Sequence, residues 1–304
     1  KDQLGEGFDE VIDIDLGRFK SEMLKLLGGQ AVTSKTFLLA LYAAYALCLN
    51  QDLSRKKLFF HHIHHMGRLP DYLKDFPKSK IICMTRDPRA NFVSGILHWR
   101  AYHPPTDNGR HLHFYIKRIL EDAVPLEKHP NEYIVVRLED LGDTVLLRKL
   151  CDWLNVTYDN CLTESTWGGL RWHGDRLSAT KNRERGWSRE MVTNQWETHL
   201  NVVDRYVLNY IMFHRLRHYG YPCRNINILD SLLVPVLIFL PLTFELRFFS
   251  FGYIRSRLMA KDYGAVFQNV AFMVRRIWLF LGFYRRATGS RKFDQPLLRA
   301  ADGV

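Results

Sequence analysis

Arginine, aspartate and serine side chains follow one short apolar run in an order suited to binding an anion. Residues 81–85 are apolar or β-favouring and predict a buried parallel strand. Asp87 then suits a helix N-cap and precedes a proline, so residues 89–99 are expected to continue as a helix. Free N–H groups and the dipole at such a helix start favour negative charge. Arg86 adds a planar, permanently charged fork, and Ser94 adds a hydroxyl farther along the helix.

This strand followed by Arg-Asp-Pro-Arg and then Ser94 resembles the 3′-phosphate motif of the sulfotransferases. Those enzymes use 3′-phosphoadenosine 5′-phosphosulfate (PAPS) and release its desulfated form, PAP. In that family the arginine and the serine of the motif hold the 3′-phosphate, so the resemblance assigns this role to Arg86 and Ser94. The competing interpretation is a structural arginine at a strand end and an ordinary helix serine.

Two later stretches resemble the same family, in the same order along the chain. Residues 133–137 predict a second buried strand, followed by Glu-Asp-Leu at residues 139–141 and a helix over residues 145–154. Residues 167–187 form a basic, glycine-containing stretch that predicts a loop, and residues 194–221 predict a long helix. In the family such a loop folds over the nucleotide and completes the 3′-phosphate site. The resemblance therefore points to its three central cations, Lys181, Arg183 and Arg185.

A histidine-rich segment precedes the first motif. Many cytosolic sulfotransferases carry Lys-x-His about two dozen residues before the phosphate-binding arginine, and His64 lies 22 residues before Arg86. The resemblance assigns His64 as the catalytic base, with His62 at the lysine position; a capping or surface histidine is the alternative. Residues 61–65 hold four histidines, but adjacent histidines cannot all face one ion, so we expect no metal site.

One signature of the family is not found. Its 5′-phosphosulfate loop reads approximately Pro-Lys/Arg-Ser-Gly-Thr-Thr after the first strand, and no such sequence lies in that context before Lys80. Residues 29–36 imitate a phosphate-binding loop, but they follow a predicted helix and lack the second glycine, so a helix–helix turn is preferred. Two explanations stay open: the chain lacks its true N-terminal part, or the protein is catalytically inactive.

Alternating strands and helices predict an α/β fold with a parallel sheet. The resemblance makes it a three-layer sheet of the P-loop-like sulfotransferase type, with the nucleotide at the carboxyl ends of the strands. Residues 1–223 would form this domain without its first strand and loop, and residues 224–304 a basic, hydrophobic helical appendage. The five cysteines include no CxxC pair, so neither a disulfide framework nor a cysteine zinc site is indicated.

Positive charge gathers towards the end of the chain. The net charge is +11, and residues 224–304 carry 12 Lys and Arg against 5 Asp and Glu. The uncharged core at residues 231–244 is shorter than the ~20 residues of a membrane-spanning helix. Apolar and aromatic residues mixed with arginines over residues 229–286 favour peripheral contact with a membrane, on a cytoplasmic face or in the Golgi lumen. A helical hairpin packed on the domain or on another subunit is the alternative. No nucleic-acid-binding motif accompanies the charge.

Taken together, the resemblance implies a sulfotransferase that moves a sulfuryl group from PAPS to a hydroxyl of a carbohydrate or lipid-linked acceptor. The alternative is an inactive sulfotransferase-like domain that acts as a structural or scaffold subunit. The histidines and the 5′-phosphosulfate loop distinguish the enzyme from the inactive domain, because only the enzyme needs a catalytic base and residues that bind the sulfonate.

Overall fold

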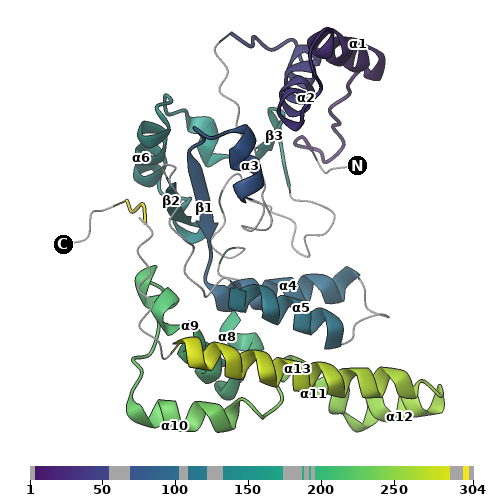
Figure 1. Ribbon diagram of the computed structural model, residues 1–304, viewed down its shortest axis with the longest axis vertical. Helices are drawn as coiled ribbons and strands as arrows, with labels where there is room; N and C mark the ends of the chain where they lie inside the picture. The colour runs from purple at the N-terminus through teal and green to yellow at the C-terminus, as the bar shows by residue number, and fades with distance from the viewer. Residues whose placement is uncertain are drawn as a thin grey trace. The chain divides into compact units, whose positions relative to one another are not determined.

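The computed structural model describes residues 4–54, 69–102, 109–121, 133–173, 187, 192, 196–287 and 297–300 (Figure 1). It divides into two compact units. The first spans Gln3–Ile81, and the second comprises Ile82–Lys128 together with Tyr133–Val304. The division lies within the first predicted strand and not after residue 223.

The first unit is helical in the residues that the structure describes. Helices α1 (Leu16–Leu27) and α2 (Ser34–Cys48) pack against each other, and a short helix α3 (Leu69–Asp75) follows. Asp15 caps α1, and the Thr33 side chain caps α2 through a reciprocal pair of hydrogen bonds with Thr36. The stretch that imitates a phosphate-binding loop is therefore a helix–helix turn, as predicted.

The second unit contains a small parallel sheet. Strands β1 (Ile81–Thr85) and β2 (Tyr133–Arg137) have the predicted bounds and form a two-stranded parallel sheet. Residues near Leu297 extend it, because Val135 and Leu297 form a parallel bridge and the Leu298 N–H donates to the Val135 carbonyl at 2.9 Å. The unit is thus α/β and mostly helical; within the described residues, the fuller three-layer sheet stays a prediction.

Helices surround this sheet and carry most of the core. Two of them pack together, α4 (Pro88–Tyr102) and α5 (Gly109–Glu121). After β2 come a 3₁₀ turn η3 (Leu138–Asp140), α6 (Thr144–Leu154), η4 (Asn160–Thr163) and a hairpin of β3 (Thr166–Trp167) and β4 (Leu170–Arg171).

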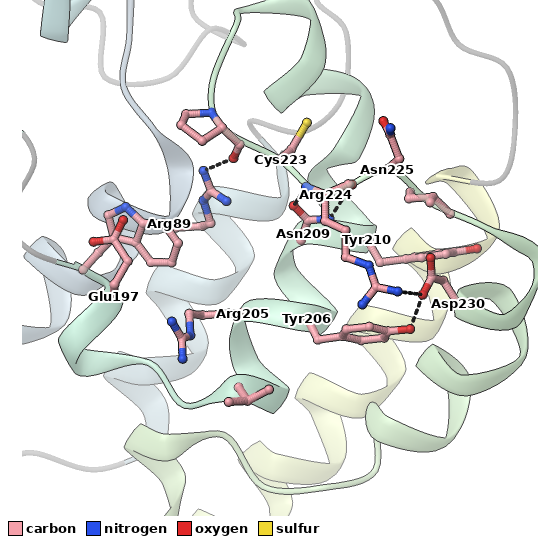
Figure 2. A pocket seen from close by; sticks show the side chains of 14 residues that line it. Arg89, Glu197, Arg205, Tyr206, Asn209, Tyr210, Cys223, Arg224, Asn225 and Asp230 are labelled. Carbon is pink, nitrogen blue, oxygen red and sulfur yellow. Dashed lines mark hydrogen bonds and ion pairs between the residues drawn. The ribbon is translucent and has the colours of Figure 1, made fainter.

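The long helix predicted over residues 194–221 is two helices. They are α8 (Trp196–His199) and α9 (Val202–His218), and Asn201 breaks the helix because its side chain caps α9 by accepting the Asp204 N–H. The prediction of one continuous helix was wrong for this reason. One face of α9 lines a cavity of about 500 Å³ (Figure 2).

The C-terminal helices share the core of the second unit. They are α10 (Ile228–Leu237), α11 (Thr243–Leu246), η5 (Arg247–Phe249), α12 (Phe251–Met259) and α13 (Tyr263–Ala287). Val234 and Phe280 are completely buried, in one hydrophobic cluster with residues of α4, α5 and α9. The expected boundary after residue 223 is therefore not a break between compact units, because burial of these apolar faces joins both sides of it.

A buried ion pair fixes α13 to the loops around α10 and α11. The Arg276 guanidinium is 1% exposed; it donates to Glu245 at 3.0 Å and to the carbonyls of Ile238 and Leu240 at 2.6 and 2.9 Å. Glu245 in turn accepts the Leu242 N–H at 2.8 Å. One of the arginines in the stretch expected to contact a membrane is therefore the centre of a buried network of polar contacts inside the unit.

Candidate functional site

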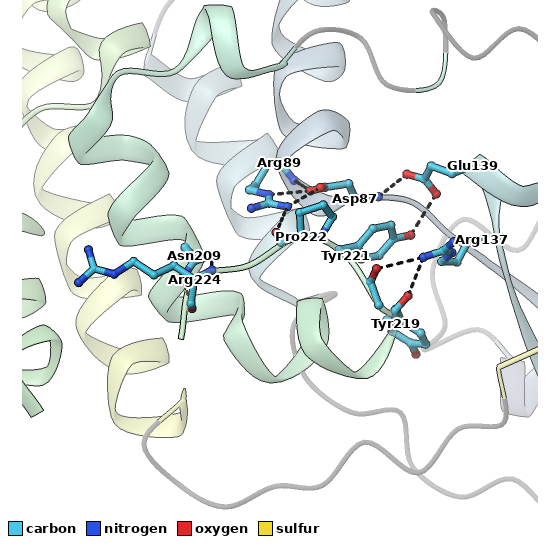
Figure 3. A network of polar contacts seen from close by, with 10 residues as sticks. Asp87, Arg89, Arg137, Glu139, Asn209, Tyr219, Tyr221, Pro222 and Arg224 are labelled. Atoms are coloured by element: carbon cyan, nitrogen blue, oxygen red, sulfur yellow. Dashed lines mark hydrogen bonds and ion pairs between the residues drawn. The ribbon is translucent and has the colours of Figure 1, made fainter. Parts of the chain in front are cut away.

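The start of α4 is held by its own carboxylate. Asp87 accepts the Arg89 N–H at 2.9 Å, which confirms it as the helix cap, and the same carboxylate binds the Arg89 guanidinium at 2.9 and 2.6 Å (Figure 3). Both side chains are buried. The Arg89 guanidinium also donates to the Pro222 carbonyl at 2.7 Å and stacks on the Trp196 ring at 4.3 Å. The second arginine of the motif is thus structural.

Glu139 links three segments beside this cap. Its carboxylate accepts the Asp87 N–H at 2.8 Å and the Tyr221 hydroxyl at 3.1 Å. Burial and the neighbouring Glu139 charge both raise the pKa of Tyr221, so the phenol stays protonated and donates. The carboxyl ends of β1 and β2 are therefore tied to the chain that leaves α9.

Arg137, the last residue of β2, binds the same part of the chain after α9. Arg137 forms a bidentate pair with Asp140, both bonds being 2.6 Å. It also donates to the carbonyls of Tyr219 and Gly220 at 3.0 and 3.2 Å (Figure 3). Gly220 has a φ of +71°, which lets the chain turn sharply after α9. The hydrogen bonds to Asp140 raise the pKa of Arg137 above the usual value for arginine.

These contacts occupy backbone N–H groups at the start of α4 that were expected to bind an anion. The N–H groups of Asp87 and Arg89 at the start of α4 already donate to carboxylates of the protein, so the prediction of free N–H groups there was wrong for these two. The physical reason is that the protein's own side chains supply the negative charge that a helix N-terminus favours. An anion at this end of the sheet would depend on side chains instead.

Arg86 stands at the carboxyl end of β1 and is half-buried. Its Nε donates to the Val192 carbonyl at 2.8 Å. Burial lowers the pKa of Arg86, while the nearby Glu139 and Asp87 carboxylates act in the opposite direction. Arginine stays charged under such a shift, and a partly desolvated guanidinium attracts an anion more strongly than an exposed one.

Ser94 lies in α4, close to the end of its second turn, and is half-buried. At 1.5 Å per residue it is about 9 Å along the axis from the first residue of the helix. The structure thus keeps Arg86 and Ser94 on one strand–turn–helix unit, as the sequence predicted. Their roles as phosphate ligands stay a prediction.

The remaining predicted site residues lie outside the described residues: His62, His64, Lys181, Arg183 and Arg185. Trp187, at the end of the predicted basic loop, is described. Its indole N–H donates to the Leu138 carbonyl at 3.0 Å, and a Cβ on Gly142 would lie 2.6 Å from its ring. Glycine at 142 therefore lets the indole pack against the chain just after β2. No cluster of three or more potential metal ligands occurs among the described residues.

Several residues of this region were not singled out from the sequence. Glu139 belongs to the Glu-Asp-Leu triplet at residues 139–141, but nothing in the sequence indicates that its carboxylate accepts the Asp87 N–H. Arg215 of α9 donates to the Thr85 hydroxyl at 3.0 Å, across 130 positions. Such contacts depend on how α9 crosses the sheet, and a single sequence carries no signal for them.

Comparison with known proteins adds no relative. No family model matches the chain, and neither the curated proteins nor the solved structures contain a significant match.

Proposed function

We propose that the protein is a PAPS-dependent sulfotransferase whose 3′-phosphate site is built on β1 and α4. The observation that carries this proposal is the half-buried Arg86 guanidinium at the carboxyl end of a parallel strand, ahead of a helix whose cap is already satisfied. Asp87, Arg89 and Glu139 hold the turn, and the two remaining residues of the motif, Arg86 and Ser94, are the proposed ligands of the 3′-phosphate. Parallel sheets bind ligands at this end of their strands.

The proposed reaction transfers a sulfuryl group in line. The oxygen of an acceptor hydroxyl attacks sulfur, the bond from sulfur to the 5′-phosphate oxygen breaks, and PAP leaves with that oxygen. The acceptor's proton passes to His64, and His62 in its protonated form assists the leaving oxygen. Lys181, Arg183 and Arg185 neutralise the nucleotide, a role that Trp187 supports because it fixes the end of their loop beside η3. The three-layer sheet belongs to this proposal, and the acceptor is a carbohydrate or lipid-linked hydroxyl.

Calorimetric titration with PAP tests the nucleotide site. Arg86→Ala should weaken binding by about 1.5–3 kcal/mol, because a charged hydrogen-bonding partner is lost. Ser94→Ala should weaken it by about 1 kcal/mol. Arg255→Ala removes the same charge from an exposed position on α12 and should leave the affinity unchanged. Arg86→Lys, which keeps the charge but not the fork, should fall between wild type and Arg86→Ala.

Equal PAP affinities for wild type and a folded Arg86→Ala protein would remove Arg86 from the site. Transfer of labelled sulfate from PAPS to a carbohydrate acceptor then separates enzyme from scaffold. Binding of PAP with no transfer to any acceptor class, in full-length protein, would favour the inactive domain.

We further propose that the C-terminal helices rest on an anionic membrane surface. Along α10, Ile228, Leu229, Leu232 and Val236 are 64–82% exposed, which is unusual for a contiguous apolar face. A second exposed stripe follows the helical period of α13 from Tyr263 to Trp278. In Figure 1, α10 and α12 lie along one edge of their unit, on the far side of α13 from α4 and α5.

The charges of the same segment suit an anionic partner. Residues 224–287 contain nine Lys and Arg and three Asp and Glu. Each of the three acids is paired with an arginine of the segment: Asp230 with Arg224, Glu245 with Arg276, and Asp262 with Arg257. The segment therefore carries six more cations than acids, and a basic residue near an anionic bilayer contributes about 1 kcal/mol.

Peripheral contact of the C-terminal helices with a membrane surface fits the structure better than a membrane-spanning α13. By length and composition α13 could span a membrane over Tyr263–Arg285, a test that core helices also pass. However, Arg276 in that stretch is bound to Glu245 inside the unit. A spanning helix would have to give up this pair in hydrocarbon, at a cost of several kcal/mol.

Liposome flotation tests the contact. Full-length protein should float with vesicles of phosphatidylcholine and phosphatidylserine at low salt, and Leu232→Asp should reduce the bound fraction at least tenfold. Leu24→Asp changes an equally exposed leucine on α1 and serves as the control. Flotation that Leu232→Asp does not affect would contradict the role of α10. Resistance of the bound protein to alkaline carbonate would indicate crossing instead.

A further inference from the structure

A cavity of about 500 Å³ lies within the second unit, beside the paired Arg89 at the start of α4 (Figure 2). One face of α9 lines it at helical spacing, through Val202, Arg205, Tyr206 and Asn209. The other walls come from α8, from residues 222–226 and from the starts of α4 and α10. Its volume is within the range of small-molecule sites.

The cavity walls are held in place by contacts of their own. The Tyr206 hydroxyl donates to Asp230, which also pairs with Arg224 at 3.3 Å. Arg224 stacks over the Tyr206 ring at 5.2 Å, and the Asn209 side chain bonds both the N–H and the carbonyl of Arg224. A site whose walls are fixed without a ligand loses little conformational entropy on binding.

Of the three arginines that line the cavity, two are neutralised by the protein. Asp87 pairs with Arg89, and Asp230 pairs with Arg224. No hydrogen bond or ion pair joins the Arg205 guanidinium to any residue that the structure describes, and its Nε is buried without a partner. The Nε itself has almost no accessible surface, so a ligand in the cavity would meet the terminal N–H groups of the guanidinium, which can form charge-assisted hydrogen bonds with an anion.

We propose that this cavity binds an organic anion with a flat apolar body, and that Arg205 receives the anionic group. Apolar contact would come from Val202, Cys223 and Ile226, with the Trp196 and Tyr206 rings beside them. Glu197, an exposed residue of the lining, forms no ion pair with Arg205 and leaves its charge uncompensated. This site is separate from the nucleotide site on Arg86 and does not depend on sulfuryl transfer.

Calorimetric titration with 2-naphthyl sulfate tests the proposal, with 2-naphthol and inorganic sulfate as the separate halves of the probe. The intact probe should bind saturably and at least tenfold more tightly than either half. Arg205→Gln should weaken its binding at least tenfold. The thermal stability of that variant should be no lower than that of wild type, because the substitution breaks no hydrogen bond or ion pair to a described residue and removes a buried Nε that has no acceptor. Naphthoate and naphthyl phosphate compare the anionic groups.

Three controls make the outcome decisive. Arg255→Ala removes a positive charge from exposed α12 and should change the affinity less than twofold; Arg86→Ala should do the same. Val202→Trp, at the exposed start of α9, narrows the cavity without touching Arg205 and should also weaken binding. Non-saturable binding, equal affinity for Arg205→Gln and wild type, or loss of binding in Arg86→Ala alone would each overturn the proposal.

Discussion

Arginines serve opposite purposes in two neighbouring regions of the second unit. At the carboxyl ends of β1 and β2, Arg89 and Arg137 each grip a carboxylate bidentately and a backbone carbonyl as well. In the cavity beside α9, Arg205 has no such partner among the described residues. The paired Arg89 and Arg137 join helices and strands, whereas the Arg205 guanidinium is available to a ligand. The net charge of +11 does not distinguish these cases; only the partners do.

The largest loss of stability is expected from removing Arg276, which is paired with Glu245. Arg276→Met should lower the free energy of unfolding by about 3–5 kcal/mol, because it leaves the Glu245 carboxylate buried without its cation. Urea denaturation measures this. The exposed neighbour provides the control, and Arg275→Met should cost less than about 1 kcal/mol. Adding Glu245→Gln to Arg276→Met should restore part of the loss, and a purely additive double variant would contradict the pairing.

A smaller loss is expected at the strand-end region from Asp87→Asn. The amide oxygen still caps α4, but Arg89 keeps a buried charge without its counter-ion, so we expect about 2–3 kcal/mol. Asp143→Asn alters an exposed helix cap on α6 that has no arginine partner among the described residues, and it should cost less than about 1 kcal/mol. Similar losses in the two variants would show that Asp87 acts only as a cap.

The smallest effect is a pH dependence centred on Asp204. Burial raises the pKa of Asp204 above its usual 3.8 and the pKa of Glu245 above 4.5, while Arg276 lowers both. Because the native carboxyls bind protons more tightly than the unfolded chain, their contribution to stability is complete below these usual values and is lost as pH rises through the native pKa. Urea denaturation from about pH 4 to about pH 7 measures the slope, because the usual pKa values of carboxyl groups lie at the lower end of that range.

Asp204→Asn should make this decline with pH shallower, since it removes one of the two raised carboxyls while an amide oxygen can still accept the Thr243 N–H. An unchanged slope in Asp204→Asn would show that Asp204 does not titrate between these pH values.

Local patterns predicted the elements well. The bounds of β1 and β2 agree with the apolar runs, and Asp87 caps α4 as its place before the proline predicts. These features depend on neighbours in sequence, so a single chain carries them. The break at Asn201 is also local, but the apolar residues on both sides of it concealed the cap.

Distant contacts were not predictable in the same way. Arg276 lies in the stretch expected to contact a membrane, and in sequence an arginine beside aromatics looks the same whether its partner is lipid or Glu245, 31 positions away. The cavity gathers residues of four helices and one extended stretch. Of the candidate site, the strand–turn–helix unit followed from the sequence, but the occupied N–H groups at its helix start did not.

The bridge between Val135 and Leu297 has a consequence for how the protein is made. On a ribosome, β2 emerges 162 residues before the segment that covers its second edge. Until then a nascent chain presents an unpaired strand edge of the kind that recruits other chains. We therefore expect the sheet to close only after synthesis has passed Leu298, and chaperones to matter most during that interval. A bulky fusion placed just after residue 296 would prolong that exposure without altering any residue of the two sites.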